Sequence, residues 1–370
     1  MVHSLMQAVK YKVTWKTFLM PVIGLLAFFA YIYVFNVDLL EIIATIQHIN
    51  VTFYFLAAIA SLLDVLFFAL AWHSLLKHLQ VKISRLKSYL FIWIGIFVDT
   101  LIPAESVSGE IAKIYFVNKE QNGAAGKTTA SIVAQRLIGM GINIATLLTG
   151  AILLLIEGQL FGILLALTLF LVAITFLFLV LTMLLCVKEK WTMRIVNAII
   201  NFAEWITRKR WKLARLREEV VGATRAFHTA IKEYARAPKT LVTAISFSTT
   251  SWILTLCIFY LTFLSIGYPQ ISWSAILVIS AIFMAVKSIP VGVPFEVGLP
   301  EITLTTLLYL FVRTWTGTDA LAWEISATAT ILMRLLTLWL RFFIGFAAQQ
   351  WAGIRAIKAG TNSKTTVAGN

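Results

Sequence analysis

The sequence predicts an all-α, polytopic transmembrane helix bundle. Hydrophobic residues make up 60% of the 370-residue chain, whereas apolar residues, glycine included, are only about half of a soluble domain. Several apolar runs approach or exceed the roughly 20 residues that a helix needs to cross a bilayer. Lipid admits only helices or closed barrels, and no run alternates as a barrel strand would. The chain is therefore expected to cross the membrane as helices.

The charge balance agrees with a membrane protein. The chain carries 31 Lys and Arg against 17 Asp and Glu, for a net charge of +14. These basic residues cluster between hydrophobic runs, as they do in the cytoplasmic loops of membrane proteins, so a nucleic-acid partner is not expected. Cys186 and Cys257 both lie in apolar runs and form no zinc or disulfide pattern. No metal or cofactor motif is present.

Six apolar segments are long enough to be full spans, at about 17–35, 51–76, 128–156, 160–187, 241–266 and 322–351. No small-residue cleavage site follows the first, which is expected to remain as a span rather than a signal peptide. The integral membrane domain is predicted at 1–356, with halves at about 1–187 and 240–356. The tail, 357–370, is expected to be disordered.

The connection between the halves, 188–239, holds 13 Lys and Arg against 5 Asp and Glu. Its apolar residues recur at helical spacing, and its tryptophans suit a membrane interface. We expect one or two basic amphipathic helices on the cytoplasmic surface. A basic protein-binding face is the alternative.

Two further hydrophobic stretches are short and are broken by proline, glycine and acid. The first, 91–104, runs into Glu105 to Glu110, and the second, 276–289, runs into Pro290 to Glu301. Each is followed about thirty residues later by an arginine inside a long apolar segment. Interrupted segments at matching places in two halves indicate the binding site of a transporter.

The distribution of basic residues suggests how these stretches enter the membrane. It places both termini, the 77–87 loop, the 113–127 region and the 188–239 connection on one side, the cytoplasm. This count works only if both broken segments re-enter, the first from the cytoplasm and the second from outside. The prediction is two oppositely oriented re-entrant hairpins in an inverted-topology repeat, in the cell (plasma) membrane.

Arg136 and Arg334 are the sharpest site candidates. An ionised side chain near the bilayer centre costs about 2.5–3.5 kcal/mol unless it pairs or faces a wet cavity. A guanidinium group binds phosphate or carboxylate in a bidentate manner. Each arginine therefore either holds an anionic lipid headgroup or forms a salt bridge to a glutamate. Arg341 lies seven residues after Arg334, on the same helix face if the helix is regular, and is expected to reach the interface.

Glu110 and Glu301 follow glycines at the two turns. Each either caps a helix or presents a carboxylate to a proton, a cation or a basic headgroup. Asp64 is an isolated acid available to pair with any of the arginines. The remaining substrate-binding candidates are Asp99, Lys287, Glu296 and Glu105, and the turn residues are Pro103, Gly109, Pro290, Gly292 and Gly298.

The run from Ile102-Pro103 to Gly109-Glu110, followed by Ala134-Gln-Arg136-Leu, resembles the membrane region of lysylphosphatidylglycerol synthetases and their stand-alone flippase-like relatives. Pro290 to Glu301 is similar to that family's second turn, and Arg334 and Gly345 resemble its last helix. Two departures stand out. Gly139 replaces an Asp that relatives often carry, and the second turn has Val-Pro where glycines are usual.

The resemblance implies lipid translocation rather than synthesis, because the soluble aminoacyl-transfer domain of the synthetases is not present in these 370 residues. The expected partners are anionic phospholipid or polyprenyl-linked lipid, a proton or cation as coupling ion, and a second copy of the chain. The protein is not expected to be an enzyme. The alternatives are an integral-membrane enzyme or an accessory scaffold acting on lipid-linked substrates.

Overall fold

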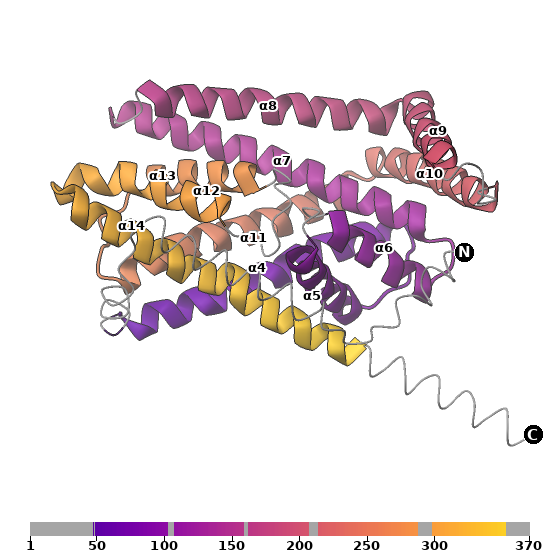
Figure 1. Ribbon diagram of the computed structural model, residues 1–370. Helices are drawn as coiled ribbons and strands as arrows, with labels where there is room; N and C mark the ends of the chain where they lie inside the picture. The colour runs from indigo at the N-terminus through magenta and orange to yellow at the C-terminus, as the bar shows by residue number, and fades with distance from the viewer. Residues whose placement is uncertain are drawn as a thin grey trace, which may run out of the picture.

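The part of the chain that the computed structural model describes consists of helices and short connections and contains no strand (Figure 1). It comprises residues 47, 49–102, 107–158, 162–206, 214–287 and 298–352. Within these residues, five helices are long and apolar enough to cross a membrane: Val51–His78, Ala125–Ile156, Leu165–Val187, Pro238–Ser265 and Asp319–Ala352. Each matches an expected span to within a few residues. The expected first span, 17–35, lies outside the described residues.

Helices α4 (Val51–His78) and α11 (Pro238–Ser265) form the most extensive helix pair of the described chain. They are antiparallel along their whole length. At one end the Asn50 backbone N–H donates to the Ser265 carbonyl at 2.7 Å, and at the other Thr240 Oγ1 lies 3.2 Å from His78 Nδ1. This pair joins the first and second halves of the chain.

The first broken segment folds as a helical hairpin. Helices α5 (Arg85–Leu101) and α6 (Val107–Glu120) pack against each other. A 2.6 Å ion pair between Lys87 and Glu120 closes the base of the hairpin. Helix α7 (Ala125–Ile156) follows directly, so it begins at the same end of the molecule as the hairpin base.

The second broken segment forms a hairpin at the opposite end. Helices α12 (Trp273–Lys287) and α13 (Leu299–Thr316) pack together. The base of this second hairpin lies beside the C-terminal end of α7, where Ser274 Oγ donates to Glu157 Oε2 at 2.7 Å. The two hairpins therefore have their bases at opposite ends of α7 (Figure 1).

The last long helix begins as α14 (Asp319–Arg334), passes through a π-helical turn (Leu335–Trp339) and continues to Ala352. In this turn the Leu340 N–H bonds to the Leu335 carbonyl. Ser61 Oγ of α4 donates to the Leu336 carbonyl at 3.1 Å. Because π-turns shift the helical register and often mark functional sites, this turn changes which way the following residues point.

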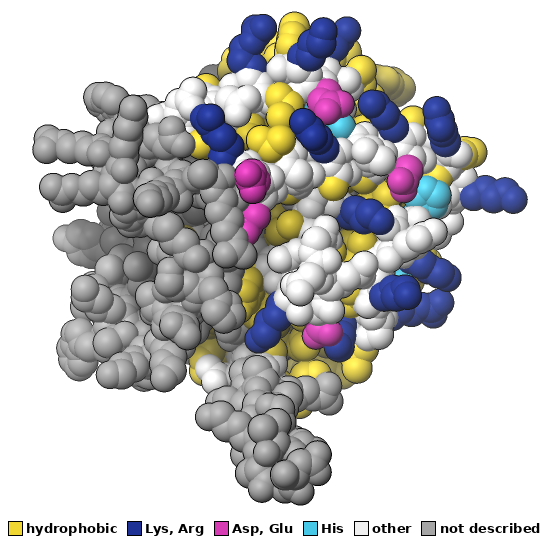
Figure 2. All heavy atoms as spheres, turned by 90° about the vertical axis from the view of Figure 1, so that its right-hand side faces the viewer, with side chains coloured by type: hydrophobic (Ala, Val, Ile, Leu, Met, Phe, Trp, Pro, Cys, Tyr) yellow, Lys and Arg dark blue, Asp and Glu magenta, His cyan; other side chains and the backbone are white. Residues whose placement is uncertain are grey.

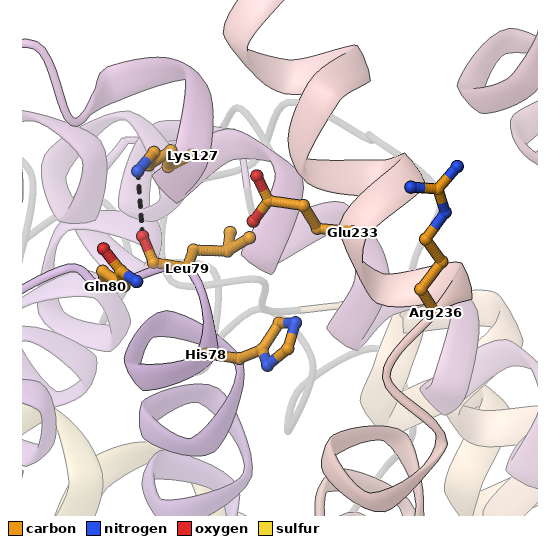
Figure 3. A pocket seen from close by; sticks show the side chains of 6 residues that line it. All are labelled: His78, Leu79, Gln80, Lys127, Glu233 and Arg236. Carbon is orange, nitrogen blue, oxygen red and sulfur yellow. Dashed lines mark hydrogen bonds between the residues drawn. The ribbon is translucent and has the colours of Figure 1, made fainter.

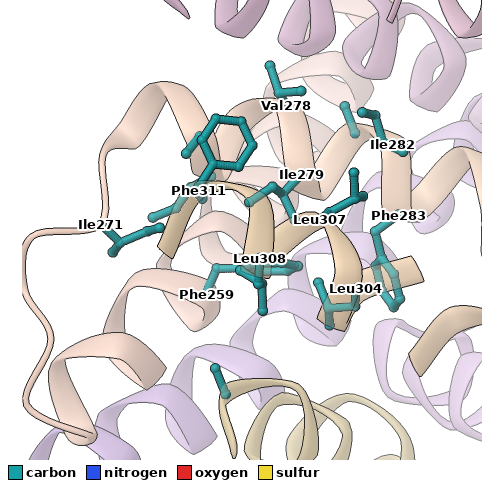
Figure 4. Close-up of a cluster of buried hydrophobic side chains, with 14 of the residues drawn as sticks. Phe259, Ile271, Val278, Ile279, Ile282, Phe283, Leu304, Leu307, Leu308 and Phe311 are labelled. Atoms are coloured by element: carbon teal, nitrogen blue, oxygen red, sulfur yellow. The ribbon is translucent and has the colours of Figure 1, made fainter. Parts of the chain in front are cut away.

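Two glycines allow a long helix of one half to pack closely on the hairpin of the other half. A Cβ on Gly150 of α7 would lie 2.8 Å from Leu277 Cβ of α12, and one on Gly345 would lie 2.6 Å from the Trp93 carbonyl of α5. Small residues permit such close approach in membranes, where packing rather than the hydrophobic effect associates helices. The buried side chains around α12 and α13 are shown in Figure 4.

The connection between the halves contains α9 (Glu189–Ile206) and α10 (Ala214–Ala235), reached through α8 (Gly162–Val187). Helix α8 lies along α7, and α9 turns away at its end (Figure 1). The Tyr234 hydroxyl of α10 donates to the Leu75 carbonyl of α4 at 3.0 Å. Burial raises the pKa of Tyr234, so the hydroxyl stays protonated and remains a donor. Lys and Arg side chains are numerous on this end of the molecule (Figure 2).

Candidate functional site

The tip of the first hairpin carries an ion pair, which we call the first half-site. Glu110 lies in the first turn of α6, and Arg136 lies about three turns into α7. Arg136 Nε donates to Glu110 Oε1 at 2.6 Å. The Arg136 side chain is 41% exposed and that of Glu110 is 20% exposed. The pair is therefore accessible from outside the helix bundle.

The tip of the second hairpin carries a matching pair, the second half-site. Arg334 Nε of α14 donates to Glu301 Oε1 of α13 at 2.5 Å. Both side chains are only 2% exposed. Glu301 Oε2 also accepts from the Gly298 N–H at 2.7 Å, which makes Glu301 both a helix cap and an ion-pair partner. Gly298 has φ of +108°, a conformation that strains residues other than glycine.

Asp99 fastens the start of α6 to α5. Its Oδ1 accepts from Ser108 Oγ at 2.7 Å and from the Gly109 N–H at 2.6 Å. A Cβ on Gly109 would lie 2.3 Å from both Asp99 Oδ2 and the Gly95 carbonyl, so only glycine fits there. Asp99, expected to bind substrate, holds the hairpin tip together in this structure.

Lys113 lies beside the first half-site and is not among the site residues expected from the sequence. It lies three residues after Glu110 on α6 and is only 8% exposed. Its ammonium group lies 5.5 Å from the centroid of the Trp72 ring, within the range of a cation–π contact. The spacing from Glu110 is the signal that was available, because residues three apart share a helix face.

A third charged centre lies between α4, α11 and the last helix. Arg341 Nη2 donates to Asp64 Oδ2 at 2.7 Å, and Arg341 Nε donates to Ser61 Oγ at 3.1 Å. Ser251 of α11 also donates to Asp64. The Arg341 and Asp64 side chains are 17% and 9% exposed. Asp64, an isolated acid in the sequence, is thus partnered by Arg341.

Two expectations for Arg341 are wrong. It does not share a contact face with Arg334, because Arg334 meets α13 whereas Arg341 meets α4. The π-turn between them has more residues per turn than a regular helix, which changes the direction in which Arg341 points. Nor does Arg341 extend to the interface, because its guanidinium group turns inward to Asp64.

Of the other expected site residues, one lies at the end of a helix and five lie outside the described residues. Lys287 is the last residue of α12. Five residues lie in the stretches 103–106 and 288–297, outside the described residues: Pro103, Glu105, Pro290, Gly292 and Glu296.

A cavity of about 410 Å³ lies at the C-terminal end of α4 (Figure 3). It is lined by His78, Leu79, Gln80, Lys127, Glu233 and Arg236. The Lys127 ammonium donates to the Leu79 carbonyl at 3.0 Å, a favourable contact for a cation at a helix C-terminus. None of the expected site residues lines this cavity. We interpret it as a gap where α4, α7 and α10 pack together, and not as a binding site.

The first half-site is suited to binding an anion. Among the described contacts, Arg136 uses only its Nε, so its two terminal nitrogens remain for a ligand. A phosphate group matches this planar donor set. A carboxylate beside each arginine supplies the counter-charge when no ligand is bound. Charged groups retained at membrane depth, facing inward and paired, are typical of substrate or ion pathways.

These features define a multi-pass helical membrane protein with paired charges inside its helix bundle. The chain belongs to the family described as the lysylphosphatidylglycerol synthase TM region, whose model matches residues 21–345. It is similar to a UPF0104 membrane protein of Pyrococcus horikoshii, with 24% identity over 300 residues that cover 80% of this chain and 86% of that protein. A UPF0104 membrane protein of Methanothermobacter thermautotrophicus is 23% identical over 343 residues, covering 91% and 96%.

Proposed function

We propose that this protein moves an anionic or amphiphilic lipid between the two leaflets of the cell membrane. The observation that carries the proposal is the pair of matching Arg–Glu contacts, Arg136–Glu110 and Arg334–Glu301, at the tips of two hairpins with bases at opposite ends of the molecule. A headgroup crossing the bilayer needs polar partners on both sides of the centre. One half-site for each leaflet meets that need.

The order and lengths of the helices support an inverted-topology repeat. The sequence long helix, short hairpin, long helix occurs twice. The opening helices, α4 and α11, are 28 residues each, and the closing helices are 32 and 34 residues. Because α4 and α11 run antiparallel, equivalent elements point in opposite directions. The two hairpins would then re-enter from opposite faces, as in many secondary transporters.

The basic end of the molecule supports an orientation. Lys and Arg gather where α9 and α10 lie (Figure 2), and such residues face the cytoplasm in membrane proteins. The first hairpin has its base at this end. In this orientation the first hairpin opens from the cytoplasmic leaflet. We propose that both termini and the 188–239 connection are also cytoplasmic.

In the proposed cycle Arg136 and Arg334 hold the phosphate group in turn, and the acyl or polyprenyl tails stay in the bilayer. Glu110 and Glu301 neutralise the arginines when no lipid is bound, or carry a coupling proton. The family's name refers to lysylphosphatidylglycerol, which makes a phospholipid the first substrate class to test. We propose transport rather than catalysis, driven by an ion gradient or passive.

The test is a liposome assay of transbilayer movement with full-length protein. Fluorescent anionic, zwitterionic and polyprenyl lipids are compared. Arg136→Ala and Arg334→Ala are expected to slow transport more than tenfold. Arg313→Ala is the matched control, because its ion pair with Asp319 is 59% and 61% exposed and lies away from both half-sites. Absence of movement for every lipid would refute the proposal.

The same preparation separates the alternatives. Chemical turnover of a lipid by purified protein would indicate a membrane enzyme. A scaffold for another enzyme would instead lose function when α9 and α10 are deleted and keep it in Arg136→Ala and Arg334→Ala.

A further inference from the structure

We propose that Lys113 and Arg136 together bind the phosphate group, and that the first half-site is the one that receives it in the conformation seen here. The inference deepens the proposed function, since it names which of two similar half-sites is ready for ligand. It rests on four observations about Lys113 and its surroundings.

The first observation is that Lys113 is a buried cation without a carboxylate at contact distance. Only 8% of the residue is exposed, and no ion pair within 4.0 Å joins it to a carboxylate among the described residues. The Trp72 ring at 5.5 Å offsets part of its charge. A buried charge without a close partner is costly, so this position favours an incoming anion.

The second observation is that the nearby carboxylates are already engaged. Glu110 and Asp99 act on Lys113 through their charge. Glu110, however, makes its short contact with Arg136, and Asp99 accepts from Ser108 and the Gly109 N–H. Neither carboxylate is at contact distance from the ammonium group.

The third observation is that Lys113 lies three residues after Glu110 on the same helix, α6. Residues three apart on a helix lie close enough to pair. When a phosphate group takes Arg136, Glu110 turns to Lys113, and the carboxylate is not left alone. The phosphate then lies between the two cations, and the exchange requires no net loss of ion pairs.

The fourth observation is the contrast with the second half-site. The residue three positions after Glu301 is Leu304, which is 1% exposed. The position that corresponds to Lys113 is therefore apolar in α13, and displacing Glu301 from Arg334 would leave a carboxylate in a site that is 2% exposed. The second half-site is closed in this conformation, and the first is available.

The chemistry specifies a phosphate group, which a lipid headgroup and inorganic phosphate both supply. Binding of three probes to full-length protein in detergent, measured by titration calorimetry, distinguishes these sources. The probes are dihexanoylphosphatidic acid, sodium phosphate alone, and dihexanoylglycerol, which has the same tails without phosphate. Phosphatidic acid is expected to bind and dihexanoylglycerol is not. Equal binding of sodium phosphate would support the site and identify free phosphate as the ligand.

Variants test the residues. Lys113→Met keeps the apolar stem and removes the charge, and Arg136→Gln removes the guanidinium group. Each is expected to weaken phosphatidic acid binding at least tenfold. Lys119→Met is the matched control, because Lys119 is an exposed lysine on the same helix. Lys113→Gln serves as a second neutral variant if Lys113→Met does not fold.

Binding like that of the natural protein in Lys113→Met or Lys113→Gln would overturn the inference, as would equally tight binding of dihexanoylglycerol. Transport is measured separately in liposomes. Phosphate binding that depends on Lys113 without any transport would refute the proposed function and leave this inference standing. Full transport by Lys113→Met would refute this inference and leave the proposed function standing.

Discussion

Ser251 donates a hydrogen bond to Asp64, and the two residues hold matching positions in their helices. Asp64 lies thirteen residues after Val51, and Ser251 lies thirteen residues after Pro238, in helices of 28 residues that run antiparallel. The contact is therefore at the shared midpoint of α4 and α11. Arg341 completes it from the last helix, so the two halves meet at a polar centre within the bundle.

The two half-sites should differ in their contribution to stability. Arg334→Met leaves Glu301 buried without its partner and is expected to destabilise the protein by about 3–5 kcal/mol. Arg136→Met breaks a half-exposed pair and is expected to cost about 0–1 kcal/mol. Denaturant unfolding in detergent measures both. Replacing both partners, in Arg334→Met with Glu301→Leu, should recover most of the loss; failure to recover would contradict a simple unpaired-charge effect.

Asp64 and Arg341 should be strongly coupled. Asp64→Asn leaves the Arg341 guanidinium group inside the bundle without its counter-charge, at an expected cost of about 3–5 kcal/mol. A double-mutant cycle with Arg341→Met isolates the pair. We expect a coupling energy above about 1 kcal/mol. The exposed pair Arg313–Asp319 is the control and should give much less. Equal coupling in both cycles would show that burial of the Asp64 pair has no energetic effect.

Gly109→Ala should disrupt the tip of the first hairpin. The added Cβ would lie 2.3 Å from Asp99 Oδ2 and from the Gly95 carbonyl, and such overpacking costs about 1–3 kcal/mol. Gly139→Ala is the control, because a Cβ there meets nothing within 4 Å. Thermal unfolding should separate the two variants clearly. Similar melting temperatures would mean that the hairpin tip can rearrange to accommodate the added Cβ at little cost in stability.

Gly150→Val and Gly345→Val should each push a long helix away from the hairpin of the other half. Their Cβ atoms would lie 2.8 Å from Leu277 Cβ and 2.6 Å from the Trp93 carbonyl. We expect both to slow lipid transport more than fivefold in liposomes. Gly141→Val, with open space around its Cβ, should transport normally. If transport by Gly141→Val fell as much as in the other two variants, the cause would be valine in a helix and not the lost close contact.

Much of the helical framework could be predicted from the sequence. Apolar run length located five spans to within a few residues, because membrane thickness sets helix length. The pairing of Arg136 and Arg334 with glutamates was one of two alternatives, because unpaired charge is costly in lipid. Sequence could not decide which glutamate each arginine meets, since this depends on how the hairpins pack.

Two features of the site could not be predicted from the sequence, because they depend on an irregular helical turn and on contacts between helices. The π-turn at Leu335–Trp339 rotates Arg341 onto α4, and nothing in a regular 3.6-residue period anticipates it. Lys113 was missed because its burial depends on contacts with other helices, among them Trp72 of α4 and Gly95 of α5. Membrane re-entry of the hairpins and the inverted repeat stay predictions.

The crossed packing of Gly150 and Gly345 has a consequence for how such a chain can be divided. Part of the surface that receives each hairpin belongs to the other half, so a half-length fragment would expose an unfilled groove at its own hairpin. Two fragments expressed separately would have to associate in opposite orientations to restore both contacts. These contacts therefore tie the two halves together, so that neither hairpin is fully packed without the long helix of the other half.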